Sequence, residues 1–334
     1  MSDSLKGMAS IAGARDEWPA LPYAEWKDTL HAVHMWTQVV GKIRLALTPL
    51  TNHWWNSTLA VTPRGLTAAM MPMPGGNDAF QIDFDFVDHE LVFLTSRGTR
   101  AAIPLQPMSV AQLYQQVLDT LARLGVPDPG ILPVPVEVAT VVPFLEDREV
   151  RPYDREMVRR LHTALVRMQF VFDRFRADFL GKASSGQFFW GGFDLASARF
   201  SGRRGPAYAG GSAPNVNIHI MHEAYSHELI AVGFWPGNDD APEAEFYSYA
   251  MPAPPGLADA TIRPDSAKWV AARGEFILPY DAVRTAADPA AMLLSFMQST
   301  YDAAADLGRW DRALLEERPI CDCVRLPATA VGHR

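Results

Sequence analysis

The chain has little cysteine, no long apolar run and no excess of basic residues. Its only cysteines, Cys321 and Cys323, are too few for a structural zinc site or a disulfide framework, so we interpret them as surface thiols. No stretch approaches the roughly 18–20 apolar residues that a membrane-spanning helix needs. The first 18 residues also lack the basic and apolar segments of a secretory signal. These absences predict a cytoplasmic protein with no membrane partner.

The charge balance and several missing motifs exclude further classes. The chain has 30 Lys and Arg residues against 38 Asp and Glu residues, whereas a general nucleic-acid binder needs a basic face, so we expect no nucleic-acid partner. The Gly-rich stretch 201–211 lacks the Gly-Lys-Ser/Thr ending of a phosphate-binding loop. No Gly-x-Ser-x-Gly elbow and no dinucleotide-binding fingerprint occurs, so no cofactor is identified.

What is present is a chain of 334 residues with an ordinary apolar fraction of 48%, enough to bury a substantial core. Apolar residues recur at spacings of three and four along Tyr23–Leu47 and Arg155–Leu180, which predicts two long amphipathic helices. Asp154 is the expected N-cap of the second helix and Gly181 its expected stop.

The segments after these two helices resemble each other. Each helix is followed by antiparallel strands, and each half ends in a shorter helix. Ser109 and Gln112 form a capping-box pattern before the first closing helix, and Asp288 with Pro289 opens the second. The expected strands are Thr58–Thr62, Phe80–Val87, Leu91–Leu94, Phe193–Phe200, His227–Trp235 and Glu245–Met251.

We therefore predict an α+β fold of two similar halves, each helix–antiparallel strands–helix, that arose by internal duplication. The alternative is that unrelated α+β segments show the same order by coincidence. The predicted divisions are an N-terminal half 1–126, a Pro-rich linker 127–154, a C-terminal half 155–312 and a tail 313–334. The second half has longer loops, and functional groups concentrate on loops, so we expect the site there.

The densest group of titratable residues is the run from His219 to Glu228. His227 with Glu223 or Glu228 could form a proton-transfer pair, which would make these three the catalytic residues. Alternatively His219, His222 and His227 could bind a divalent metal, although their spacing matches no standard helical pair. A structural role for His227 is the third interpretation.

Other side chains are candidates for binding a substrate. Arg199 and Arg203 flank the Gly-rich stretch and suit an anionic group. Trp190, Trp235, His53 and Trp54 could line an apolar pocket, although many aromatic residues simply build the core. The first helix carries a polar stripe of Lys27, His31, His34, Gln38 and Lys42, which is either a solvated face or a set of side chains facing a cleft beside His53 and Trp54.

Long, Trp-rich runs recur along the chain. They include Asn52-His53-Trp54-Trp55, Phe188-Phe189-Trp190-Gly191, Glu223-Ala224-Tyr225-Ser226-His227-Glu228 and Gly233-Phe234-Trp235-Pro236-Gly237. Together these runs resemble the bacterial family catalogued as domain of unknown function 5996. The resemblance spans Trp18 to Trp310 and implies a bacterial, cytoplasmic protein, but it brings no activity. Gln187 stands where the family pattern has His, and His219 and His222 are particular to this chain, which weakens a shared metal site.

Three functions are consistent with these patterns. The first is a small-molecule enzyme or binding protein with an aromatic-lined pocket and a His–carboxylate pair. The second is a non-catalytic interaction module, and the third is a metal-dependent hydrolase. A deep pocket containing His227 would favour the first function, whereas a flat apolar patch would favour the second.

Overall fold

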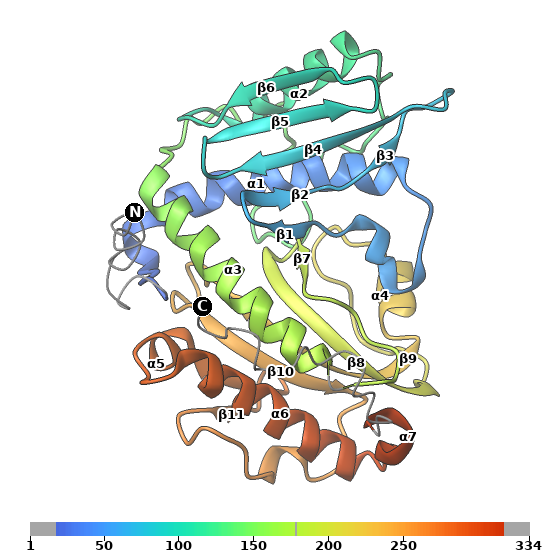
Figure 1. Ribbon diagram of the computed structural model, residues 1–334, viewed down its shortest axis with the longest axis vertical. Helices are drawn as coiled ribbons and strands as arrows, with labels where there is room; N and C mark the ends of the chain where they lie inside the picture. Colours follow the sequence, from blue (N-terminus) through green and yellow to red (C-terminus); the bar gives the residue numbers. More distant parts are fainter. Residues whose placement is uncertain (1–17, 178, 317–334) are drawn as a thin grey trace, which may run out of the picture.

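The computed structural model describes residues 18–177 and 179–316 and has two antiparallel sheets with helices around them (Figure 1). The α+β class is therefore confirmed. The N-terminal sheet has the order β1-β2-β4-β5-β6, with β3 also paired to β4; the C-terminal sheet has the order β11-β12-β10-β9-β8-β7. The strands of the first are β1 Ala60–Thr62, β2 Gly65–Thr67, β3 Met71–Pro72, β4 Ala79–Asp85, β5 Glu90–Thr95 and β6 Arg100–Pro104. Those of the second are β7 Gln187–Phe189, β8 Asp194–Arg204, β9 His227–Trp235, β10 Glu245–Met251, β11 Lys268–Val270 and β12 Glu275–Pro279.

The two sheets meet edge to edge at one bridge. The Leu59 N–H donates to the Phe188 carbonyl at 2.9 Å, and the Phe188 N–H donates to the Leu59 carbonyl at 2.8 Å. This antiparallel bridge brings β1 beside β7 in the middle of the molecule (Figure 1). The halves are thus separate sheets that share a single seam, and the internal duplication stays a prediction.

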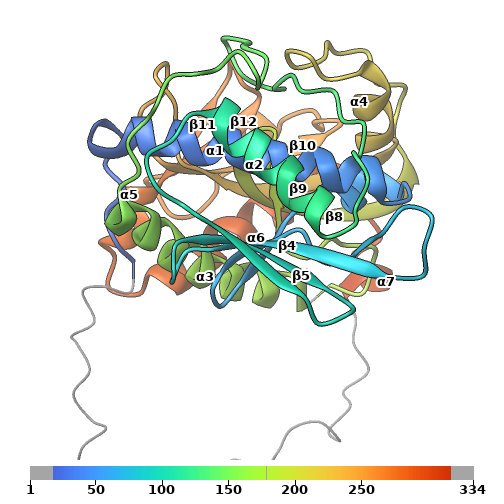
Figure 2. The same cartoon turned by 90° about the horizontal axis from the view of Figure 1, so that it is seen from above.

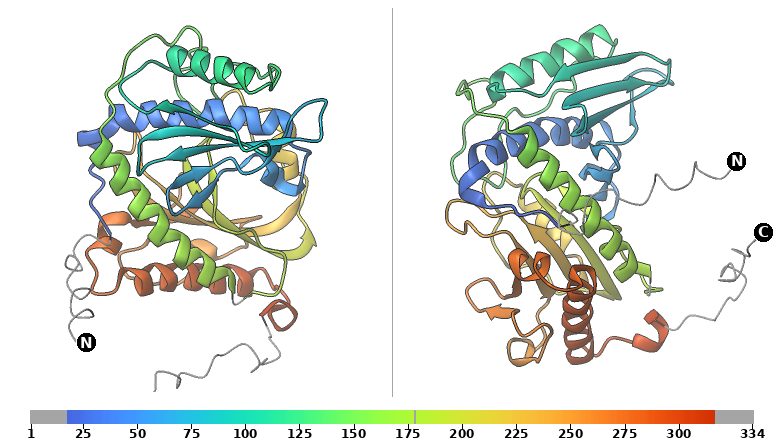
Figure 3. Two further views of the ribbon diagram at one scale, coloured as in Figure 1. Left: turned by 45° about the horizontal axis from the view of Figure 1, so that its top comes forward. Right: turned by 60° about the vertical axis from the view of Figure 1, so that its left-hand side comes forward.

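The four longest helices of the described residues connect and cover the sheets. Helix α1 (Tyr23–Leu47) crosses the middle of the molecule, and α2 (Val110–Arg123) packs against it (Figure 2). Helix α3 (Arg155–Ala177) runs obliquely from the N-terminal half to the C-terminal sheet, where it packs beside α6 (Pro289–Leu307; Figure 3). The shorter helices are η1 Asn52–Ser57, α4 Ile218–Ala224, η2 Leu257–Asp259, α5 Tyr280–Arg284 and α7 Arg312–Glu316.

Most helix ends follow the local signals. The Ser109–Gln112 capping box forms, and the Asp288 side chain accepts the Ala291 N–H at 2.9 Å at the start of α6. Asp154 likewise accepts the N–H groups of Glu156 and Met157 ahead of α3. Helix α3 ends at Ala177, earlier than the predicted Leu180. Cys321, Cys323 and most of the predicted tail lie outside the described residues.

The two faces of the C-terminal sheet have different surroundings. Helices α3 and α6 cover one face. The other face carries alternate residues of three neighbouring strands, because side chains alternate between faces along a strand. They are Ala196, Ala198 and Phe200 on β8, Leu229 and Ala231 on β9, and Tyr247 and Tyr249 on β10. No helix within the described residues is long and apolar enough to cross a membrane.

Candidate functional site

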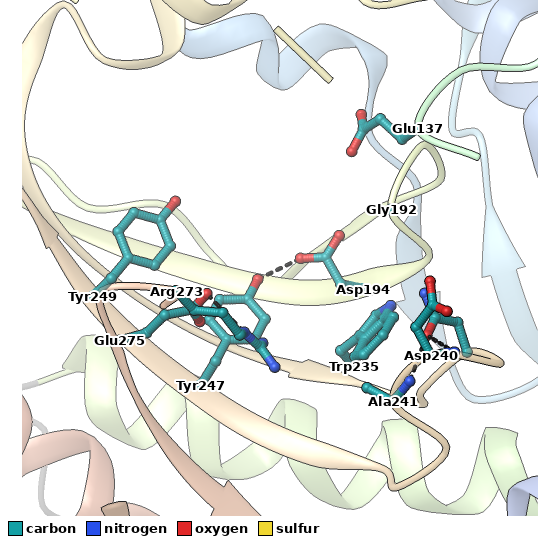
Figure 4. A pocket seen from close by; sticks show the side chains of 11 residues that line it. Glu137, Gly192, Asp194, Trp235, Asp240, Ala241, Tyr247, Tyr249, Arg273 and Glu275 are labelled. Carbon is teal, nitrogen blue, oxygen red and sulfur yellow. Dashed lines mark hydrogen bonds and ion pairs between the residues drawn. The ribbon is translucent and has the colours of Figure 1, made fainter. Parts of the chain in front are cut away.

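Two adjoining cavities lie over the face of the C-terminal sheet that α3 and α6 leave uncovered. The larger cavity has a volume of about 510 Å³ and the smaller about 440 Å³. Both lie in the range of sites for small organic molecules, roughly 300–1,000 Å³. Four side chains line both cavities: Glu137, Asp194, Tyr247 and Tyr249 (Figure 4).

Asp194 begins strand β8 and accepts a hydrogen bond from the Tyr247 hydroxyl on β10 (Figure 4). Gly233 pairs with Tyr247 across β9 and β10, and a Cβ atom at Gly233 would lie 2.2 Å from the Tyr247 ring, so glycine makes room for this ring. Burial raises the pKa of Asp194 to about 7, with a further contribution from repulsion by Glu137; the Tyr247 hydrogen bond opposes the rise. Asp194 therefore exchanges a proton near neutral pH.

Glu137 lies in the segment 127–154, which we predicted to be a linker. Its backbone has φ 57°, a conformation that non-glycine residues seldom adopt. Its N–H donates to the Pro214 carbonyl at 2.9 Å, and Asn215 Nδ2 donates to the Pro135 carbonyl at 3.0 Å. The carboxylate opens into both cavities, and burial raises its pKa. The segment around Glu137 is thus fixed against the C-terminal half.

Glu137 and Asp194 lie on either side of one small space above Gly192. A Cβ atom at Gly192 would lie 3.0 Å from Asp194 Oδ1 and 3.3 Å from Glu137 Oε2. A Cβ atom at Gly191 would collide with Glu137 Oε1 at 2.3 Å. The two glycines therefore leave room for the carboxyl groups to face each other, and we refer to Glu137 and Asp194 as the carboxyl pair.

Helix α1 holds both segments that carry the carboxyl pair. Gln38 Nε2 donates to the Val136 carbonyl at 2.8 Å, and Gln38 Oε1 accepts the Val136 N–H at 2.8 Å. His34 Nε2 donates to the Gly191 carbonyl at 2.8 Å. Burial lowers the pKa of His34 to about 4, so this imidazole is neutral. The polar stripe of α1 therefore faces inward at His34, Gln38 and Lys42, while Lys27 and His31 are exposed.

The raised pKa of Asp194 makes stability depend on pH. An aspartate in the unfolded chain titrates near 3.9, so the folded state binds the proton more tightly than the unfolded state. The stabilisation that protonated Asp194 gives to the folded state is complete below about pH 4 and is lost as the pH rises through about 7. We expect the free energy of unfolding in urea to be about 2 kcal/mol lower at pH 8 than at pH 5. This expected difference allows for screening of the Asp194 charge by solvent that enters the cavity. Asp194→Asn should remove this part of the slope, and equal slopes in the two proteins would contradict the assignment.

Four of the predicted binding residues line the cavities. His53, Trp54 and Trp190 line the larger one, and Trp235 lines the smaller. Trp190 is fixed by a hydrogen bond from Nε1 to the Ser57 carbonyl at 2.8 Å.

His53 has a defined tautomer. Its Nδ1 lies 3.1 Å from the carbonyls of both Glu223 and Ala224, which fixes the proton on Nδ1. Its Nε2 therefore accepts a hydrogen bond from Lys182 Nζ at 2.6 Å. Burial and the nearby Lys182 lower the pKa of His53, so this end of the larger cavity holds a neutral imidazole beside an amine.

The predicted catalytic residues have other partners. His227 lies beside His53, with ring centroids 5.8 Å apart, and its Nδ1 lies 3.0 Å from the Ser226 hydroxyl. Glu223 accepts the His53 backbone N–H at 3.0 Å. Glu228 accepts the Ser201 hydroxyl at 2.9 Å and forms an ion pair with Arg203 at 2.6 Å. His227 therefore lies next to the larger cavity, while both carboxylates hold protein groups.

The two predicted anion-binding arginines point away from the cavities. Arg199 is 1% exposed and faces α3 and α6, because its neighbours Ala198 and Phe200 take the cavity face of β8. Its guanidinium carbon lies 3.6 Å from the centre of the Phe175 ring and 4.3 Å from that of Tyr301. Arg203 bonds Glu228 and the carbonyls of Gly308 and Arg309. Neither arginine lines either cavity, so the predicted anion-binding role is not supported by their positions.

The predicted metal ligands do not converge. In the part of the chain that the structure describes, no group of three His, Cys, Asp or Glu side chains is placed to hold a metal ion. The rings of His219 and His222 lie 5.9 Å apart on α4, and His227 lies beyond the end of that helix. The arrangement that the third function requires is absent from these residues.

A family model matches residues 18–317, and its description is family of unknown function (DUF5996). The chain belongs to this family. The resemblance noted from the Trp-rich runs is therefore confirmed. No curated protein and no solved structure matches the chain. The match covers every residue of both cavities, so the cavities and the carboxyl pair lie within the part of the chain that the family model matches.

The carboxyl pair is not evident from the sequence. Asp194 falls within a predicted strand and Glu137 within the predicted linker. One signal was present for each: Asp194 follows two glycines at the start of a strand, and Glu137 is the single charged residue between Ile131 and Leu145. An isolated acidic residue in an apolar, Pro-rich segment indicates a carboxyl group that the fold holds in a specific position.

Proposed function

We propose that the protein is an enzyme that binds a small organic molecule in the larger cavity and transfers protons through Asp194 and Glu137. The observation that carries this proposal is the facing arrangement of the two carboxyl groups where the cavities join. General acid–base catalysis needs a group that both gains and loses a proton near the working pH. A pair of carboxyls in unlike surroundings supplies this property, because each disfavours the charge of the other.

The roles follow from the surroundings of each side chain. Asp194 is the acid/base group, since its pKa of about 7 leaves both protonation states populated at neutral pH. Tyr247 donates to Asp194 and orients its second oxygen towards the open space. Glu137 has no hydrogen-bond partner for its carboxylate among the described residues, so it can contact the substrate directly. Trp54 and Trp190 provide apolar faces for the body of the substrate.

This proposal keeps the small-molecule function predicted from the sequence, but it assigns proton transfer to the carboxyl pair instead of His227. Glu223 and Glu228 are engaged by His53, Ser201 and Arg203, which supports this assignment. The interaction-module alternative predicted a flat apolar patch. The aromatic side chains instead line a concave space that suits a small molecule better than a protein surface.

The test has two steps, a screen for ligands and an assay of the reaction that each ligand undergoes. A panel of small organic molecules would be screened by tryptophan fluorescence, and each ligand found would be incubated with protein in D₂O and examined by NMR for exchange or conversion. We expect Asp194→Asn to bind the ligand but to slow the chemical step by about 10²–10⁴-fold, the usual contribution of a positioned acid or base.

Two controls sharpen this test. Glu137→Gln should also slow the reaction, whereas Glu146→Gln, an exposed acid of the same segment, should leave it unchanged. Full retention of the rate in Asp194→Asn would exclude the proposed role, even if the cavity still bound the ligand.

A further inference from the structure

Lys42 is a buried amine that lines the larger cavity. It lies one helical turn after Gln38 on α1 and therefore faces the same side of the helix. The residue is only 8% exposed, yet it belongs to the cavity wall together with Leu45 and Trp190. The Lys42 ammonium nitrogen lies 5.9 Å from the centre of the Trp190 ring. The described residues provide no carboxylate or carbonyl partner for this nitrogen.

A charged lysine in this position is poorly stabilised. A buried ammonium group needs an ion-pair partner or several acceptors to offset its lost hydration. The surroundings of Lys42 are mainly apolar and aromatic, and burial lowers its pKa. More of the amine is therefore neutral at pH 7 than for an exposed lysine, and the neutral amine is the nucleophile.

The use of lysine rather than arginine supports a chemical role. The chain has only five lysines among its 30 basic residues, and all but one of the ion pairs in the described residues involve arginine. Arginine keeps its charge when buried and suits anion binding, whereas a buried lysine loses charge and gains nucleophilicity. Holding an anionic ligand would therefore be served better by arginine than by Lys42.

We propose that Lys42 forms a Schiff base with an aldehyde or ketone group of a ligand bound in the larger cavity. This inference rests on the proposed function, because it uses the same cavity and names the class of substrate as carbonyl compounds. The amine nitrogen adds to the carbonyl carbon, and the resulting carbinolamine loses water. A C=N bond replaces the C=O bond, and no oxidant or reductant is needed.

The carboxyl pair fits this chemistry. The departing hydroxyl group must receive a proton, and Asp194 lines the same cavity with a proton to give near neutral pH. Lys182, the other lysine near this cavity, is a weaker candidate, because its Nζ is held by His53 Nε2 at 2.6 Å. Lys27 and Lys268 are exposed and serve as internal references.

The experiment is reductive trapping with a defined probe. The full-length protein would be incubated at pH 7 with 2-naphthaldehyde and sodium cyanoborohydride, and the adduct would be mapped by peptide mass spectrometry. We expect Lys42 to be labelled at least about ten times faster than Lys27, because the cavity would hold the aldehyde beside the Lys42 amine. The lowered pKa of Lys42 acts in the same direction. Labelling of Lys42 no faster than Lys27 and Lys268, or mainly at Lys182, would overturn the assignment.

A second probe separates this inference from the proposed function. 2-Naphthalenemethanol has the same ring system but no carbonyl group, and its binding would be followed by tryptophan fluorescence. Binding of the alcohol without labelling of Lys42 would remove the Schiff base and keep the cavity as a ligand site. Failure of both probes would overturn the Lys42 assignment, whereas the proposed function is decided by the ligand panel and the Asp194→Asn variant.

Variants of Lys42 complete the test. Lys42→Arg and Lys42→Met should each lose the specific adduct while still binding 2-naphthalenemethanol. Lys42→Met also removes a buried charge, so we expect its unfolding temperature to equal or exceed that of the parent, which shows that it folds. An undiminished naphthylmethyl adduct in either variant would show that another amine reacts.

Discussion

Replacing Gln38 by Met is expected to lower the free energy of unfolding by about 2–4 kcal/mol and to abolish turnover at the carboxyl pair. The side chain is fully buried and satisfies both backbone groups of Val136. Methionine has a similar volume but no polar atoms, so the Val136 N–H and carbonyl would be left unpaired in the interior. Each unpaired buried group costs about 1–3 kcal/mol.

The functional loss should follow from the same two bonds. Val136 precedes Glu137, whose backbone is held at φ 57°. Without Gln38 this segment is free to relax, and Glu137 is no longer held opposite Asp194. The measurements are urea unfolding and the ligand-exchange assay in D₂O. Gln115→Met, which alters an exposed glutamine on α2, is the matched control and should change neither quantity. Wild-type stability in Gln38→Met would show that water or a relaxed loop replaces these bonds.

The elements of the fold were largely predictable because their signals are local. Helix α1 spans Tyr23–Leu47 as its apolar spacing predicts, and β9 and β10 have the predicted bounds. Hydrophobic periodicity and caps depend on neighbours within a few residues, which a single sequence contains in full. The ends of α3 and of β1 differ by a few residues, since they depend on packing between the halves.

The site was only partly predictable because its parts are joined by contacts between distant segments. The aromatic residues Trp54, Trp190 and Trp235 were found from local composition. The carboxyl pair was missed, because Glu137 and Asp194 belong to different predicted segments and are brought together by contacts between distant residues, among them those of His34 and Gln38. Arg199 was predicted to bind a ligand, although its side chain lies on the face of the sheet opposite the cavities. Neighbouring residues of a strand point to opposite faces, and the sequence does not show which face of the sheet is left uncovered by helices.

Replacing Arg199 by Ala is expected to destabilise the protein by about 3–5 kcal/mol, which is a typical loss when a large buried side chain is truncated. The guanidinium lies among Phe175, Phe179 and Tyr301 and donates to the Phe175 carbonyl. Its removal would leave a cavity between β8 and the helices α3 and α6, and the stacking of a cation on these rings would be lost.

Ligand binding should survive this substitution. Arg199 faces the opposite side of the sheet from the cavities, so the folded fraction of Arg199→Ala should bind 2-naphthalenemethanol as the parent does. Arg204→Ala, at the exposed end of the same strand, is the matched control and should remain stable. Loss of binding at full stability would restore Arg199 to the substrate site and contradict its assigned position.

The seam between Leu59 and Phe188 also bears on self-association. An unpaired sheet edge is a template on which a second chain can add strands and begin an aggregate. At this seam each sheet ends in a short edge strand, β1 in one and β7 in the other, and the bridge sets these two edges against each other. The contact that brings the halves together thus also covers the edge that either half would expose alone. A fragment containing only one half would present that edge to other molecules, so separated halves should form insoluble material more readily than the intact chain.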